Sequence, residues 1–338
     1  MSGQYQLRKK KKKRVMRRGA SLLVFLACIT AASSWAYRAV DQKDIYQASD
    51  FQDSDMPDTV EINGIKCRPK TRLKTYLFMG IDTESTDGSE TEQSAAGQCD
   101  VLRLVVIDQN EDTYAVLPIN RDTITEVKSL KDDGTYIATS EVQIALAHAN
   151  GDGGTVSCEN TVDAVSNLLY GQYIDGYAAL SMDAISVLNH LAGGVTVTIE
   201  DDFSKVDPSM KTGETITLTD KQAVYYVRGR MNVGDGTNES RMRRQEQYLN
   251  ALSEIFRKKF AEDESYVQEV YNALEDYMVT MLSGNDCSRL AKAMMENEPL
   301  GTLEIEGEIS EDYLGYSQFI PDEDSLADAV IRLFYNRT

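Results

Sequence analysis

Cysteine and histidine are scarce in this chain of 338 residues, which has five of the former and two of the latter. The cysteines form no Cys-x-x-Cys pair, and none lies at metal-ligand spacing from a histidine. A structural zinc site is therefore not expected. Four cysteines follow the apolar segment described below, and either disulfides or free buried thiols remain open for them; they are Cys67, Cys99, Cys158 and Cys287.

Basic residues are scarce outside the N-terminus. The first eighteen residues carry nine Lys or Arg and no acid, whereas the whole chain has 35 basic and 54 acidic residues. Without those nine, 26 basic residues face 54 acidic ones, which leaves a net charge of −28. Such a body repels nucleic acid and contains no DNA-binding motif, so no nucleic-acid partner is expected.

Charge is absent from residues 19–37, which follow the basic tail of residues 1–18. This length is enough to cross a hydrocarbon core of about 30 Å. The positive flank predicts a single-pass transmembrane helix with a cytoplasmic N-terminus, followed by an acid-rich extracellular stalk over residues 38–71. A cleaved signal peptide is the alternative, since small residues run through ITAASSWA.

No segment repeats, and proline and glycine form no linker, so one α/β domain is expected over residues 72–338. Its first part contains three β-rich runs, at residues 73–82, 101–108 and 113–119. Each run begins or ends near a charged residue, and ligands gather at strand ends in an open α/β sheet. We therefore expect Asp82, Asp100 and Arg121 to converge.

Helical spacing of apolar residues dominates the remainder. We expect helices at residues 159–170, 182–192, 240–260, 266–282 and 286–295, another that Thr219 or Asp220 caps, and a last one through Phe334. Short strands are expected at residues 176–180, 193–199 and 303–307.

Five arginines lie within residues 225–245 of this acidic chain: Arg228, Arg230, Arg241, Arg243 and Arg244. Guanidinium groups bind phosphate through paired hydrogen bonds, so a pyrophosphate site is one interpretation and a solvated helix face the other. On a regular helix, residues two apart point about 200° apart. Arg228 and Arg230 can share one anion only if the helix ends about there, and the glycine between them predicts such an end.

Several blocks of sequence, in order, resemble the LytR-CpsA-Psr family of bacterial envelope phosphotransferases. They are LFMGID, GQCDVLRLVVID, LPINRDTITEV, LAGGVTV, LTDKQAVYYVRGR and RMRRQ, over roughly residues 73–252. No single block is specific, but their order is. The resemblance implies a central mixed β-sheet flanked by helices, behind one N-terminal membrane helix.

The resemblance also implies roles for particular residues. Asp82 and Asp100 become ligands of Mg²⁺, and Asp235 becomes an acid/base or metal-side group. Six residues become pyrophosphate ligands: Arg121, Arg228, Arg230, Arg241, Arg244 and Gln245. Phosphoryl transfer needs charge neutralisation above all, which Mg²⁺ and arginines supply. Asp82 could instead merely end its strand. Gln98, Asn120 and Thr125 are among the residues that depart from those of many members.

The implied reaction moves a glycopolymer from a polyprenyl-pyrophosphate carrier onto peptidoglycan and releases polyprenyl phosphate. The partners would be the carrier-linked polymer, peptidoglycan and the membrane. A non-catalytic protein that binds the wall or a lipid pyrophosphate is one alternative, and a transcriptional attenuator is another. The sequence does not identify the polymer, the acceptor or the oligomeric state.

Overall fold

The computed structural model describes residues 59–338 apart from 83–95, 230–231, 237, 264 and 312–315. The predicted basic tail, the predicted membrane helix and most of the predicted stalk lie outside the described residues, as does Arg230. Among the helices that the structure describes, none is both long and apolar enough to cross a membrane.

The described chain folds into two compact units. The first, here called the sheet unit, comprises residues 59–181, 278–282 and 296–338. The second, here called the helical unit, comprises residues 182–277 and 283–295. Both units lie largely within the single domain predicted over residues 72–338, and each is described by itself.

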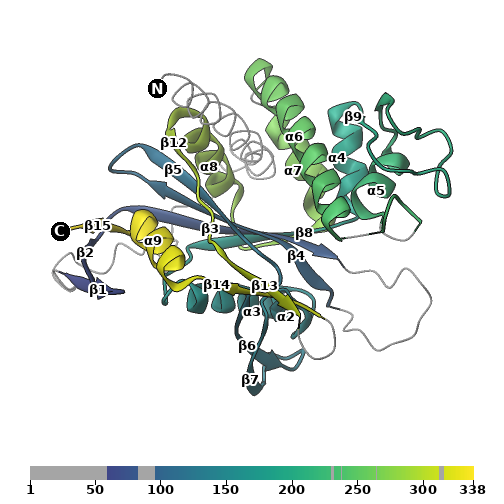
Figure 1. Cartoon of the computed structure of the whole chain (residues 1–338). Helices are drawn as coiled ribbons and strands as arrows, with labels where there is room; N and C mark the ends of the chain where they lie inside the picture. Colours follow the sequence, from purple (N-terminus) through teal and green to yellow (C-terminus); the bar gives the residue numbers. More distant parts are fainter. Residues whose placement is uncertain (1–58, 83–95, 230–231, 237, 264, 312–315) are drawn as a thin grey trace, which may run out of the picture. The chain divides into compact units, whose positions relative to one another are not determined.

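A mixed sheet of six strands lies at the centre of the sheet unit (Figure 1). Its strands are β3 (Leu73–Asp82), β4 (Gln98–Asp108), β5 (Thr113–Ile119), β8 (Gly176–Ser181), β11 (Met278–Thr280) and β12 (Glu298–Thr302), in the order β11-β8-β3-β4-β5-β12. The neighbours of β4 are antiparallel to it, whereas β8 runs parallel to β3 and β12 parallel to β5. The mixed α/β fold implied by the resemblance is confirmed.

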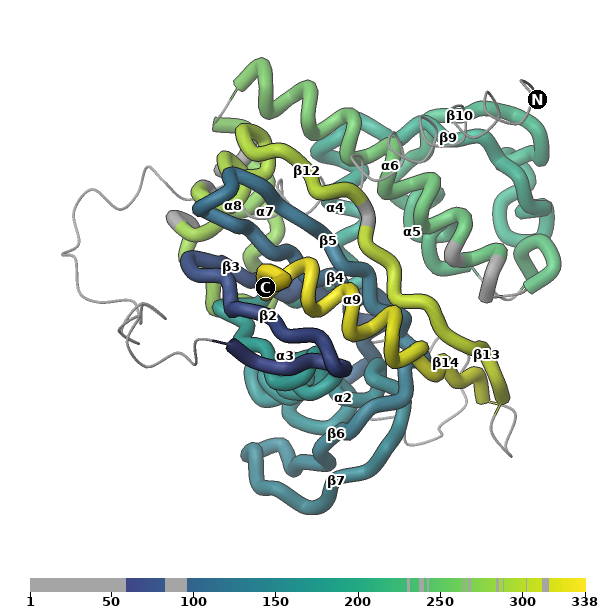
Figure 2. The backbone as a smooth tube through the Cα atoms, turned by 60° about the vertical axis from the view of Figure 1, so that its left-hand side comes forward, coloured from purple at the N-terminus to yellow at the C-terminus, as the bar shows by residue number. Residues whose placement is uncertain are grey.

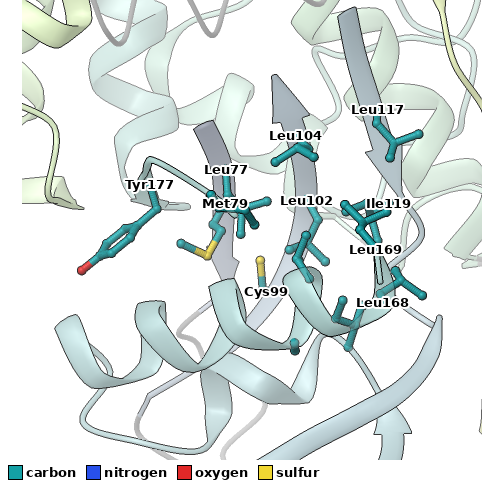
Figure 3. Packing of buried hydrophobic residues seen from close by; sticks show 14 of the residues in the cluster. Leu77, Met79, Cys99, Leu102, Leu104, Leu117, Ile119, Leu168, Leu169 and Tyr177 are labelled. Atoms are coloured by element: carbon teal, nitrogen blue, oxygen red, sulfur yellow. The ribbon is translucent and has the colours of Figure 1, made fainter. Parts of the chain in front are cut away.

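The core of this unit lies between the sheet and helix α3 (Thr155–Leu168) (Figure 3). Central strands are buried on both faces, which explains the long apolar runs of β3 and β4. Leu77, Leu102 and Leu104 have no exposed surface. Burying each such leucine stabilises the fold by roughly 1.5–3 kcal/mol. Helix α9 (Glu323–Phe334) adds Val330 and Leu333 to the same cluster.

A small sheet joins the two ends of the described chain. It contains β1 (Val60–Ile62), β2 (Ile65–Pro69) and β15 (Tyr335–Arg337), and β2 pairs with both of the others (Figure 2). These first two strands fall within the segment predicted to be a stalk. The prediction of a stalk up to residue 71 is therefore corrected, because the folded part begins about ten residues earlier.

Two hairpins complete the sheet unit. One pairs β6 (Ile124–Leu130) with β7 (Tyr136–Gln143), and β6 lies along α3, next to the short helix α2 (Leu146–Ala149). The other pairs β13 (Gly307–Glu311) with β14 (Ser317–Pro321). The strand predicted at residues 303–307 is wrong, because residues 303–306 lie between β12 and β13 and only Gly307 is in a strand, as the first residue of β13.

Helices make up most of the helical unit. They are α4 (Ala184–Ala192), α5 (Asp220–Arg228), α6 (Asn238–Glu262), α7 (Tyr266–Leu274) and α8 (Gly284–Glu296), with a hairpin of β9 (Thr196–Thr198) and β10 (Thr215–Thr217). The helix predicted over residues 266–282 is wrong beyond Leu274. A single 3₁₀ turn, Glu275–Tyr277, follows there, and residues 278–280 pair with β8 instead.

Candidate active site

In the sheet unit, Asp82, Asp100 and Arg121 belong to one edge of the central sheet. Asp82 ends β3, Asp100 lies at the start of β4, and Arg121 follows β5. Because β3 and β4 are antiparallel, as are β4 and β5, these three strand ends meet at the same edge. Chain direction therefore places residues that are up to 39 positions apart at one edge of the sheet.

A β-bulge gives Asp100 its position. Gly80 pairs with Val101 and Ile81 pairs with Cys99, so Asp100 is the extra residue between two regular pairs. Bulges redirect a side chain and are common next to functional sites. The side chain of Asp100 is 4% exposed, and its carboxylate accepts a hydrogen bond from Nη1 of Arg121.

Among its contacts with described residues, the guanidinium group of Arg121 reaches three side chains. Besides Asp100, its Nη2 donates to Oε1 of Gln98 at 2.7 Å, and its Nε lies 3.5 Å from Oδ1 of Asp122. Gln98 departs from the family pattern, and here its neutral amide oxygen orients the arginine. The structure thus brings Asp100 and Arg121 together, and Gln98, which the sequence singled out only as different from many family members, contacts the same arginine.

The backbone around Arg121 is fixed by local hydrogen bonds. Oδ1 of Asn120 accepts from the backbone NH of Asp122 at 2.9 Å, and the Asn120 carbonyl accepts from Oγ1 of Thr123 at 2.7 Å. The Arg121 carbonyl accepts from the NH of Ala145 at 3.1 Å. Asn120, another departure, therefore builds an Asx turn that the more usual proline could not form. The third departure, Thr125, lies in β6 opposite Val142.

The two carboxylates predicted to hold Mg²⁺ lie on neighbouring strands. Asp82 pairs with Gln98 in the register of β3 and β4, two residues from Asp100. Within the described residues, no group of three or more histidine, cysteine or acidic side chains is placed to hold a metal ion. Two carboxylates suit Mg²⁺, which commonly binds one or two of them and completes its shell with water and substrate phosphates.

In the helical unit, the arginine-rich stretch begins where α5 ends. A capping box starts this helix: Thr219 accepts from the NH of Gln222, and the Gln222 side chain accepts from the NH of Thr219. Arg228 is its last residue, so the predicted end of the helix at YVRGR is confirmed. The side chain of Arg228 is 14% exposed, with Nη1 at 3.5 Å from Oδ1 of Asp183.

A tight turn follows α5. Gly234 and Gly236 have φ values of 52° and 72°, a backbone region that glycine adopts without strain. Asp235 lies between them and is exposed. This placement presents its carboxylate on the surface of the helical unit.

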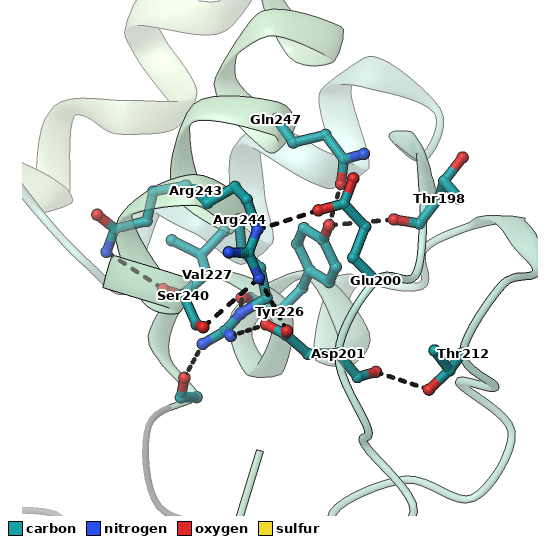
Figure 4. A network of polar contacts seen from close by, with 12 residues as sticks. Thr198, Glu200, Asp201, Thr212, Tyr226, Val227, Ser240, Arg243, Arg244 and Gln247 are labelled. Atoms are coloured by element: carbon teal, nitrogen blue, oxygen red, sulfur yellow. Dashed lines mark hydrogen bonds and ion pairs between the residues drawn. The ribbon is translucent and has the colours of Figure 1, made fainter. Parts of the chain in front are cut away.

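The first turns of α6 return to the end of α5 (Figure 4). Arg244 is 2% exposed and donates to the backbone carbonyls of Tyr226, at 3.0 Å, and of Gly229, and to the carboxylate of Asp201. Gln245 donates to the Val227 carbonyl at 3.2 Å. Arg241, in the same helix, is half-buried. The solvated-surface interpretation therefore does not hold for Arg244.

Two acidic residues in this network were missed from the sequence. Asp201 accepts from Nη2 of Arg243 at 3.0 Å as well as from Arg244, and Glu200 accepts from Nε of Arg243 at 3.0 Å. The available signal was the acidic run Glu200–Asp202 directly after the predicted strand at residues 193–199. Burial, followed in weight by the Glu200 charge, raises the pKa of Tyr226, so its hydroxyl stays protonated and donates to Gln247.

Cys67, Cys99, Cys158 and Cys287 are all free thiols, and all are buried. This settles the choice that the sequence left open. Burial raises the pKa of Cys99, and burial followed by the Asp152 charge raises the pKa of Cys158 to about 12. Both side chains are therefore neutral packing groups.

Known proteins share this architecture. The chain is 29% identical over 178 residues to a polyisoprenyl-teichoic acid–peptidoglycan teichoic acid transferase, TagU of Halalkalibacterium halodurans, a match that covers 53% of this chain and about half, 51%, of that relative. Among solved structures, TagV of B. subtilis matches with a TM-score of 0.55 at 23% identity, covering 78% of this chain and 97% of that one. The protein gbs0355 of Streptococcus agalactiae matches with a TM-score of 0.58 at 22% identity, covering 79% and 90%.

The structural matches show a shared fold, and a match along nearly the whole chain shows the family. The profile of the LytR_cpsA_psr family covers residues 35–333. It includes the edge of the central sheet with Asp82, Asp100 and Arg121 and the arginine-rich stretch after α5, so the chain belongs to the LytR_cpsA_psr family.

Proposed function

We propose that this chain is an envelope phosphotransferase, which moves a glycopolymer from a polyprenyl-pyrophosphate carrier onto peptidoglycan. The observation that carries the proposal is the group of Gln98, Asp100 and Arg121 at the sheet edge, in a chain of this family. A relative named as a teichoic acid transferase supports the same class of reaction. We further propose that residues 19–37 anchor the protein and that its body lies outside the cell membrane.

In the proposed reaction, a sugar hydroxyl of peptidoglycan attacks the phosphorus that bears the glycopolymer. A new phosphodiester P–O bond forms, the P–O bond to the polyprenyl phosphate breaks, and the hydroxyl loses its proton to a base. Arg121, Arg228, Arg230 and Arg241 are the proposed ligands of the negatively charged pyrophosphate. Guanidinium groups stabilise charge that builds up on the transferring phosphoryl group.

Asp82 and Asp100 would hold Mg²⁺, which when bound would neutralise phosphate charge. Arg121 also orients the Asp100 carboxylate, because the two groups are in direct contact. Asp235 is exposed at a tight turn and is the proposed acceptor of the hydroxyl proton. Gln245, which donates to the end of α5, is a further proposed contact of the substrate.

The test is a transfer assay with the full chain in detergent. A polyprenyl-pyrophosphate-linked glycan and peptidoglycan fragments are added, and released polyprenyl phosphate is measured. We expect release with Mg²⁺, none with EDTA, and none from Asp100→Asn with an unchanged circular dichroism spectrum. Full turnover in EDTA would reject the metal assignment.

A non-catalytic protein that binds lipid pyrophosphate remains the second candidate, because Gln98 and Asn120 replace residues common in the family. The same assay separates the two: tight binding of the carrier without any release of polyprenyl phosphate would favour this candidate. The net charge of −28 beyond the basic tail disfavours an attenuator that binds DNA.

A further inference from the structure

Arg244 is a charged side chain in the interior of the helical unit. A buried guanidinium group is tolerated only where its donors find acceptors and its charge finds a counter-charge. Here Asp201 supplies the counter-charge, two backbone carbonyls accept further hydrogen bonds, and the ring of Phe203 lies 5.6 Å from the guanidinium carbon. Because Arg244 is only 2% exposed, an anion in solvent has little access to its guanidinium group.

The carbonyls that Arg244 binds belong to the end of α5. The last carbonyls of a helix have no partner within the helix, and together they form the negative end of its dipole. Arg244 reaches Tyr226 and Gly229, and Gln245 reaches Val227 between them. The segment on either side of Arg228 is thus fastened to the first turns of α6.

Asp201, the partner of Arg244, also lies next to the turn that contains Asp235. Gly234 donates its NH to the Asp202 carbonyl at 2.9 Å. A β-carbon built on Gly234 would lie only 3.0 Å from the β-carbon of Asp201. Moving Asp201 would therefore disturb both the turn and the ion pair with Arg244.

We propose that Arg244, paired with Asp201, is a positioning residue: it holds Arg228 at the end of α5 and the turn at Asp235 in the geometry that receives the pyrophosphate, without touching the anion. This inference rests on the proposed function, and it gives Arg244 a role other than the pyrophosphate ligand implied by the family resemblance.

The first test needs no substrate. Amide hydrogen exchange is measured on the full chain for the end of α5 and for the turn at residues 233–236, in the parent, Arg244→Lys and Asp201→Asn. Lysine keeps the charge but cannot reach three separated acceptors, so we expect exchange in both segments to be about tenfold faster or more, with the sheet unit unchanged. Arg289→Lys is the matched control, because Arg289 forms an exposed ion pair with Asp286 in α8 of the same unit, outside the network around Asp201, and should leave exchange at the parent level.

The second test is a double-mutant cycle of Arg244→Lys and Arg228→Ala, with inorganic pyrophosphate binding as the measured quantity. If Arg244 acts through Arg228, Arg244→Lys should weaken binding by about tenfold in the parent but by less than about twofold in Arg228→Ala. Asp201→Asn should show the same dependence, which keeps the test valid if Arg244→Lys folds poorly.

The outcomes separate the two proposals. Parent-like exchange in both Arg244→Lys and Asp201→Asn would overturn the positioning role, and so would equal losses of affinity with and without Arg228. A parent chain that binds no pyrophosphate and transfers no polymer would instead overturn the proposed function. In that case the exchange experiment would still show whether Arg244 holds the end of α5 and the turn at residues 233–236 in place.

Discussion

At the residue scale, one arginine at the edge of the central sheet binds both a charged and a neutral side chain. Arg121 contacts the carboxylate of Asp100 and the amide of Gln98 at once, through different nitrogens of one planar group. A guanidinium fork can do this because its donors diverge in fixed directions, whereas an ammonium group is a single point charge. The identity of the cation should therefore matter as much as its charge.

We predict that Arg121→Lys lowers kcat/KM for polymer transfer by more than about tenfold, because loss of a charge-assisted pair of this kind costs about 2 to 5 kcal/mol. The measurement is the rate of polyprenyl phosphate release. Arg289→Lys is the matched control, since Arg289 forms an exposed ion pair with Asp286 one helical turn away. Parental kinetics in Arg121→Lys would contradict a role for the fork.

A second residue-scale prediction concerns the buried thiols. Burial raises the pKa of Cys158 and of Cys287 to about 12, well above the value of about 8.5 for an exposed thiol. Folding thus favours the neutral thiol, so this contribution to stability is fully present below about pH 8.5 and is lost as the pH rises toward 12.

The prediction is that the four described cysteines do not react with Ellman's reagent in the native full chain at pH 8, and that all four react in urea without reductant. Cys28→Ser should be the background, so that this fifth cysteine does not contribute. Rapid reaction in the native state would contradict the burial. Failure to react in urea would contradict free thiols and indicate disulfides.

At the scale of elements, the end of α5 depends on a close approach. Gly229 has an ordinary φ of −53°, so its backbone does not require glycine. An added β-carbon would lie 2.5 Å from the Tyr225 carbonyl oxygen and 2.9 Å from Cγ2 of Val233, which leaves no room for it. Glycine is therefore needed here for space, next to the arginine that the helix delivers.

We predict that Gly229→Ala destabilises the helical unit by about 1 to 3 kcal/mol, the usual cost of overpacking, and weakens pyrophosphate binding. Thermal unfolding and pyrophosphate titration measure the two effects. Gly213→Ala is the control: Gly213 has open space around it and should cost only the strain of its φ of +86°, with no loss of binding. Equal binding by both variants would argue against the close contact as the feature that shapes this site.

Elements were predictable from the sequence where burial left a regular pattern. The runs at residues 73–82 and 113–119 became β3 and β5 with the predicted bounds, because central strands are apolar along their length. The hairpin of β6 and β7 was missed because six of the eight residues of β7 are exposed, so no alternation marks it. The helix predicted over residues 266–282 was too long because residues 278–280 pair with β8 in the central sheet. Helical periodicity cannot reveal such a tertiary pairing.

Part of the candidate site was predictable from the sequence, and part was not. Asp100 and Arg121 could be paired in advance because antiparallel strands bring their ends to one edge. The burial of Arg244 could not, because the neighbouring Arg243 has the same chemistry and is exposed. Which of two adjacent arginines turns inward depends on the packing of α6 against α5 and on Asp201, which is 43 residues away in the chain.

At the scale of the whole molecule, charge is divided sharply between the two ends. Nine basic residues and no acids precede residues 19–37, and the remainder carries a net charge of −28. Basic residues near a membrane-spanning segment stay on the cytoplasmic side and are attracted to its anionic lipids, whereas an acidic body gains nothing from that surface. The sequence thus predicts one orientation for the full chain.

We expect protease added to intact cells stripped of their wall to degrade the body and to spare the N-terminal tail. The measurement is immunoblotting with one tag before residue 1 and another after residue 338: the C-terminal tag should disappear while the N-terminal tag persists on a fragment of a few kilodaltons. Cells permeabilised with detergent are the control, because both tags should then be lost. Replacing the nine basic residues with glutamine should make the orientation heterogeneous, since the charge bias that sets it is gone. A C-terminal tag that survives in intact cells and is lost only after permeabilisation would place the body inside the cell, out of reach of the proposed peptidoglycan acceptor.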